Sequence, residues 1–140
     1  MAMELFVVLA LETLPNTSQM NELAEKVSIP IVYEAGIDLR DIKGYLPAKV
    51  AGRKSGLEIH TSAYDKASIK LSSFDAQQYQ QPVVVTLRWG GDFSEMTSAL
   101  STAYLLSEGY SATTFEPQTN TYLSTTELKT SVFSMLDTVK

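Results

Sequence analysis

Residues 82–92 read Pro-Val-Val-Val-Thr-Leu-Arg-Trp-Gly-Gly-Asp, and this stretch decides the fold class. Residues 83–89 are mostly apolar or β-branched, which is typical of a strand in the middle of a sheet. The two glycines end the strand. Asp92, with Glu95 three positions later, predicts a capping box at the start of a helix. A buried strand followed directly by a helix indicates that sheet and helix pack together in one domain.

Two further helices are predicted in the same way. Asn16 with Gln19, and Ser124 with Glu127, form capping-box patterns, and each is followed by apolar residues at helical spacing. The helix after residue 92 is expected to end at Gly109, which would take the left-handed position that closes many helices. The last predicted helix extends to the C-terminus.

A second continuous apolar run, Leu5–Leu11, predicts another buried strand. Residues 45–50 and 57–60 flank a glycine-containing loop at 51–56 and predict a β-hairpin. The remaining expected elements are short strands at 29–33, 67–72 and 112–115, a loop or helical turn at 75–81, and a turn at 116–120. We therefore predict a single α+β domain spanning residues 1–140. Its mixed or antiparallel sheet has about five to six strands, with about three helices packed on it.

Composition excludes several kinds of chemistry. The 140 residues are 44% hydrophobic and 19% charged, as in an ordinary globular protein. The chain has no cysteine, which excludes disulfides, thiolate metal sites and cysteine nucleophiles. His60 is the single histidine, and strand alternation places it with Glu58 on the face opposite Leu57 and Ile59, toward solvent. We expect a protein that is not an enzyme and that has no catalytic, cofactor or metal site.

The sequence gives little indication of a membrane or of export. The apolar run near the N-terminus has no preceding basic residue, Glu4 stands just before it, and it is too short to span a bilayer. We expect a cytoplasmic protein with no membrane partner. The glycine turn at 90–91 matches neither of the common phosphate-binding motifs.

Charge is distributed unevenly along the chain. The formal net charge is −5, yet residues 38–70 contain seven basic and four acidic groups. The rest of the chain contains four basic and twelve acidic groups. The basic stretch is sparse and has no ladder of alternating aromatic and basic residues, so nucleic-acid binding is not expected. The acidic remainder could form a face that docks a basic protein.

Tyrosine is the second indication of a protein partner. Seven tyrosines exceed five phenylalanines, and tyrosine is favoured at interfaces because it offers a large contact area with a polar end. Combining charge and aromatic positions gives a set of candidate partner-binding residues: Asp75, Tyr79, Asp92, Glu95, Glu116, and, beside the predicted hairpin turn, Arg53 and Lys54.

Three stretches also carry a resemblance: 44–47 with 54–58, 88–95, and 115–119. Together they resemble stretches of small bacterial α+β proteins, some of which look like immunity proteins of contact-dependent or polymorphic toxin systems. Glu116 departs from the Asp-Pro-Gln turn of that pattern. The resemblance implies a non-catalytic protein that neutralises a cognate toxin, such as a basic toxin domain, by forming a tight complex.

Two other functions stay open on the sequence alone. One is a structural or adaptor domain that acts by homo-oligomerisation and buries its tyrosines between copies. The other is a small-molecule-binding domain or an enzyme that uses carboxylates, His60 or the turn at 90–91, for which a deep pocket with convergent polar groups would be needed.

Overall fold

The computed structural model describes residues 3–64, 71 and 74–139. The strands are β1 (Met3–Ala10), β2 (Ile31–Tyr33), β3 (Lys43–Val50), β4 (Arg53–Ala63), β5 (Pro82–Trp89), β6 (Thr113–Glu116) and β7 (Thr121–Leu123). The helices are α1 (Thr17–Lys26), α2 (Phe93–Tyr110) and α3 (Thr125–Val139), with short 3-10 turns η1 (Leu11–Thr13) and η3 (Ala76–Gln78).

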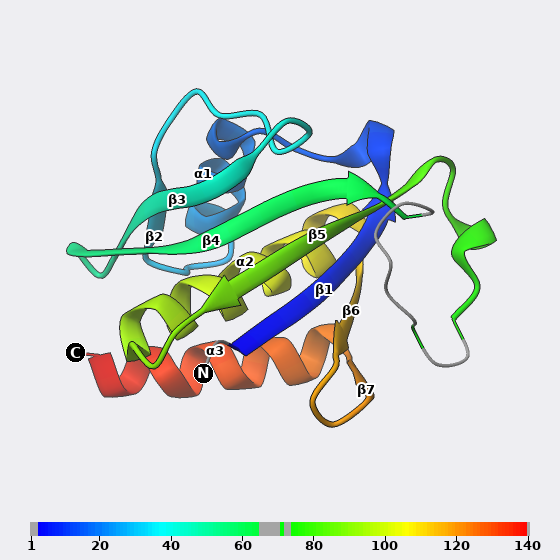
Figure 1. Cartoon of the computed structure of the whole chain (residues 1–140). Helices are drawn as coiled ribbons and strands as arrows, with labels where there is room; N and C mark the ends of the chain where they lie inside the picture. Colours follow the sequence, from blue (N-terminus) through cyan, green and yellow to red (C-terminus); the bar gives the residue numbers. More distant parts are fainter. Residues whose placement is uncertain (1–2, 65–70, 72–73, 140) are drawn as a thin grey trace.

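The seven strands form one sheet in the order β2-β3-β4-β5-β1-β6-β7, and every neighbouring pair is antiparallel. All three helices lie behind the sheet in Figure 1, so its front face is not covered by a helix. The predicted α+β class is confirmed, with three helices and slightly more strands than expected. The strand order was not predictable from the sequence.

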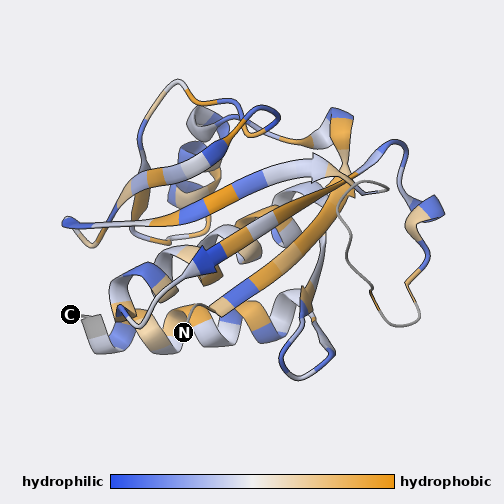
Figure 2. Cartoon of the chain, viewed as in Figure 1, coloured by the Kyte–Doolittle hydropathy of each residue, from blue (hydrophilic) through white to orange (hydrophobic). Residues whose placement is uncertain are grey.

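The two strongest predicted strands form the centre of the sheet. β1 and β5 pair along their full length, from Met3 opposite Trp89 to Ala10 opposite Pro82. Figure 2 shows both strands as mostly hydrophobic, whereas β3 and β4 alternate between hydrophobic and hydrophilic residues. Val7 and Val85 point toward the helices and are fully buried. These central strands therefore supply the core to which the outer strands are added.

α2 packs along the back of the sheet and contacts α1 and α3. Asp92 caps it by accepting hydrogen bonds from the amides of Ser94 and Glu95. The predicted role of Gly109 is wrong, because α2 continues to Tyr110 and Ser111 adopts the left-handed conformation after it. Gly109 instead allows close packing, since a Cβ there would lie 2.5 Å from a methyl carbon of Leu23 on α1.

The hairpin between β3 and β4 is tighter than predicted. Its turn consists of Ala51 and Gly52 alone, both with positive φ, and Val50 pairs with Arg53. Positive φ at both central residues is the two-residue hairpin turn whose twist matches that of the strands. Residues 53–56, expected in the loop, are therefore part of β4.

The capping boxes at Asn16 and Ser124 are both present, and η3 confirms the helical turn expected within 75–81. β7 was not predicted. The strand expected at 67–72 lies outside the described residues except for Leu71. Among the helices that the structure describes, none combines the length and hydrophobicity needed to cross a bilayer.

Candidate protein-binding surface

The strand side chains that point away from the helices form a surface that we call the open face. Register arranges them in rows that run across the sheet. Strand residues on this face include Lys43, Lys49, Lys54 and Arg88, with Glu4 and Glu58 as the acidic groups, and Glu34 follows directly after β2. The open face is therefore net positive although the protein is net negative. Sequence order alone could not reveal this, because the rows join residues from strands far apart in the chain.

The middle of the open face contains a row of alternating charges. Tyr45, Glu58, Arg88 and Glu4 lie side by side on β3, β4, β5 and β1. Arg88 Nε lies 3.6 Å from a carboxylate oxygen of Glu4, and both side chains are well exposed. Such an exposed pair contributes little to stability, typically less than about 1 kcal/mol. Its more evident effect is to fix an alternating pattern of charges on this face.

Tyr45 is held against the sheet by Ser55 and Gly56 on the neighbouring strand β4. Its hydroxyl donates to the carbonyl oxygen of Ser55 at 3.0 Å, and its ring lies over Gly56, where a Cβ would collide with the phenol. The phenol is still 49% exposed. Partial burial, and then the nearby carboxylates of Glu95 and Asp92, raise the pKa of Tyr45. Tyr45 therefore stays a neutral, ordered aromatic side chain on the surface.

The next row passes from polar to aromatic. It runs Lys43, His60, Thr86, Phe6, Phe115, Tyr122 across six strands. His60 is exposed and its strand neighbours Leu57 and Ile59 are buried, which confirms the predicted alternation. In the described part of the chain, no group of three or more histidine and carboxylate side chains is placed to hold a metal ion.

Beyond that row, residues 74–79 return over the sheet. Phe74 stacks on Tyr79 and on Tyr122, with ring centroids 6.4 and 6.3 Å apart, and Tyr122 meets Phe115 edge-on at 5.1 Å. Val8 belongs to the open face and is nevertheless fully buried at this end. An aromatic cluster thus replaces the helices as cover for part of the open face.

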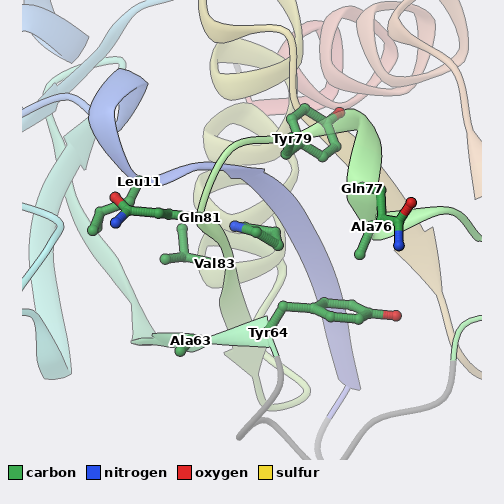
Figure 3. Close-up of a pocket in the computed structure, with 9 residues that line it drawn as sticks. Leu11, Ala63, Tyr64, Ala76, Gln77, Tyr79, Gln81 and Val83 are labelled. Carbon is green, nitrogen blue, oxygen red and sulfur yellow. The ribbon is translucent and has the colours of Figure 1, made fainter.

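Next to this cluster is a concave region that we call the aromatic hollow, with a volume of about 760 Å³. Figure 3 shows Tyr64 and Tyr79 on opposite sides of it, with Ala76 and Gln77 beside them. It is lined by Leu11, Ala63, Tyr64, Ala76, Gln77, Tyr79, Gln81, Pro82 and Val83. None of these nine lining residues is charged. The hollow suits an apolar group rather than an ion.

Tyr79 fixes one wall of the aromatic hollow. Its hydroxyl donates to the carbonyl oxygen of Ser111 at 2.8 Å and lies 2.7 Å from the hydroxyl of Thr113. These contacts attach η3 to the junction between α2 and β6. Tyr79 was singled out from the sequence as a partner-binding residue, and the structure gives its hydroxyl an internal role while leaving its ring at the edge of the hollow.

At the opposite end of the open face is a second concave region, of about 470 Å³, where β2, β3 and β4 meet. Val32, Lys49 and Lys54 lie directly opposite one another across these three strands, and we call them the lysine row. Val32 is 58% exposed, the largest value among the exposed large hydrophobic side chains. Glu34 and Pro47 form the other side of this groove.

The predicted acidic residues do not form one face. Asp92 caps α2 and Asp75 accepts from the amide of Gln77 within its own turn. Glu116 accepts from both the amide and the hydroxyl of Thr119. Glu95 lies in the first turn of α2. Most of this acidity therefore stabilises caps and turns.

The structure brings only part of the predicted set together. Ser55 Oγ donates to the carbonyl oxygen of Ser94 at 2.8 Å, so the start of β4, with Arg53 and Lys54, adjoins the start of α2, with Asp92 and Glu95. Asp75 and Tyr79 belong to the η3 segment, and Glu116 ends β6.

Several residues of the surface were missed from the sequence: Val32, Lys49, Tyr64, Phe74 and Tyr122. The high tyrosine content was the available signal for part of this group. No protein-family model, curated protein or solved structure matches the chain.

Proposed function

We propose that the chain is a protein-binding domain of the immunity type, which neutralises a cognate toxin by docking its open face against it. The observation that carries the proposal is the aromatic hollow, which lies at the end of β4 and the start of β5, beside the aromatic cluster on the open face. Protein interfaces concentrate their binding free energy in aromatic anchors that fill pockets. The hollow has tyrosine rings at its sides and could bind a protruding apolar side chain of the partner.

The exposed aromatic side chains of the open face fit this function. Tyr45 and Tyr122 are 49% and 36% exposed, and both lie on the open face. Tyrosine supplies apolar contact area with a hydrogen-bonding end, and it loses little conformational entropy when bound. The alternating charges between them would set the orientation of a partner more than its affinity.

The test is co-expression with the products of the neighbouring genes, to find one whose toxicity the wild-type chain suppresses. Gln77→Arg places a long charged side chain in the hollow, and we expect it to abolish growth protection and to weaken toxin binding about tenfold or more. Gln80→Arg is the matched control, because Gln80 is exposed on the same segment and does not line the hollow. Both variants should fold, since both glutamines are exposed.

Two results would contradict the proposal. One is wild-type chain that neither binds the toxin domain nor protects growth. The other is a Gln77→Arg variant that protects as well as Gln80→Arg does. Light scattering on the purified chain tests self-association. If the wild type is a stable homo-oligomer and Gln77→Arg disrupts it, the hollow binds a second copy of the chain and the proposal is wrong.

A further inference from the structure

The lysine row points to the chemistry of the partner. We infer that the groove at the junction of β2, β3 and β4 receives an acidic segment of the bound protein, with an aliphatic side chain of that segment against Val32. This inference rests on the proposed function, because it specifies one contact of the same docking face.

The first step is the cross-strand placement of like charges. Lys49 and Lys54 are directly opposed on β3 and β4 and point to the same face. Like charges directly opposite each other on neighbouring strands destabilise a sheet. In the part of the chain that the structure describes, neither lysine forms an ion pair. The pair therefore has unused capacity for carboxylates from outside.

The second step is the surroundings of the pair. Among the residues that line the groove, Glu34 is the one carboxylate, so Lys49 and Lys54 together leave one excess positive charge. Val32 completes the row with the most exposed large hydrophobic side chain. A groove with excess positive charge and an apolar end complements a peptide in which aspartate or glutamate adjoins an aliphatic residue.

The third step distinguishes a protein from a nucleic acid. Nucleic-acid sites neutralise several phosphates along a basic stripe. Here the basic groups are few, the row ends in valine, and the whole molecule is net negative. An acidic protein segment fits these features better than a phosphate backbone does.

The experiment is an NMR titration of the full chain with a synthetic peptide of alternating glutamate and leucine. We expect amide shifts at residues 31–34 and 47–55, weakening steeply as salt is raised. The double variant Lys49→Glu, Lys54→Glu should lose these shifts. It keeps a like-charged pair across the strands, so its urea midpoint should stay close to that of the wild type.

The single variant Lys49→Glu separates binding from stability. It creates an opposite-charge pair with Lys54, so it should raise the urea midpoint while weakening peptide binding several-fold. A single-stranded oligonucleotide is the comparison ligand and should cause no shifts at the groove. Peptide shifts elsewhere, unchanged binding by the double variant, or shifts caused by the oligonucleotide alone would each overturn the inference.

The toxin assay distinguishes failure of the acidic-segment inference from failure of the proposed function. If Gln77→Arg abolishes protection and the double lysine variant leaves protection and affinity unchanged, the open face is the docking surface and the acidic contact is wrong. If both variants weaken toxin binding, both statements are supported.

Discussion

At the scale of single residues, Gly56 links the β4 backbone to the open face. Its φ is +147°, a conformation that side-chain-bearing residues rarely adopt, and a Cβ would lie 2.7 Å from the carbonyl oxygen of Leu46. The ring of Tyr45 occupies the remaining space above it. Glycine at this point therefore allows a tyrosine to lie flat on the sheet.

We predict that Gly56→Ala lowers the free energy of unfolding by at least about 2 kcal/mol, because backbone strain and collision with Tyr45 act together. Gly91→Ala is the control, since a Cβ there meets no atom within 4 Å, and it should change stability by less than about 0.5 kcal/mol. Urea unfolding measures both. Equal stability of the two variants would show that β4 can relax around the added methyl group.

Asn21 is a second residue whose effect was not predictable from the sequence. Its side chain donates to the carbonyl oxygen of Tyr33 at 3.1 Å and accepts from the Tyr33 amide at 2.8 Å. It thereby occupies backbone groups at the outer edge of β2. Edge strands with free backbone groups can pair with other chains, so this contact protects an edge as well as attaching α1 to the sheet.

At the scale of elements, we predict that Asn21→Ala loosens the attachment of β2 to α1. Loss of both hydrogen bonds should cost about 1–3 kcal/mol of unfolding free energy. Glu25→Ala, an exposed position on the same helix, should have little effect. If hydrogen exchange at Tyr33 and the urea midpoint match those of Glu25→Ala, Asn21 does not hold this edge.

Elements whose signals are local were predicted well. The caps at Asn16 and Ser124 depend on residues three positions apart, and the apolar runs of β1 and β5 are continuous. β7 was missed because its three residues carry no pattern, and it is defined by pairing with β6. The hairpin turn was placed too long because Ala51 adopts a positive φ usually left to glycine or asparagine.

At the scale of the whole molecule, the candidate site was less predictable than the fold. On the open face, Lys43 and Tyr122 lie at the two ends of one row across six strands. This placement can be worked out only after the strand order is known. Linear charge counting found the basic central segment but attributed docking to acidic residues, most of which serve as caps and turns. A segment's charge says little about where its side chains point until the sheet register is fixed.

The acidic caps lead to a prediction for the pH dependence of global stability. The Ser94 hydroxyl, followed by the amides of Ser94 and Glu95, lowers the pKa of Asp92 in the folded chain below 3.8. The stability that the ionised Asp92 cap adds is fully present above the unfolded-state pKa of Asp92. It is lost as the pH falls through the lower folded-state pKa. Asp92→Asn keeps an accepting oxygen but cannot titrate. It should therefore lose less stability than the wild type when the pH is lowered from about 5 to about 3.

Urea midpoints measured across that range are the readout, with Glu25→Gln, at an exposed position on α1, as the control. The interpretation fails if Asp92→Asn and wild type lose stability in parallel. Glu127 is expected to contribute in the same sense, because hydrogen bonds with the amide and hydroxyl of Ser124 lower its pKa.

The internal contacts of Tyr79 reduce the conformational entropy that the chain would lose on binding a partner. Flexible loops that become ordered on binding lose conformational entropy, which weakens the complex. Here the hydroxyl of Tyr79 is already attached to Ser111 and Thr113, and its ring is already stacked on Phe74. One wall of the hollow is thus preorganised in the free chain, and a partner that enters it would encounter a surface whose ordering was completed during folding.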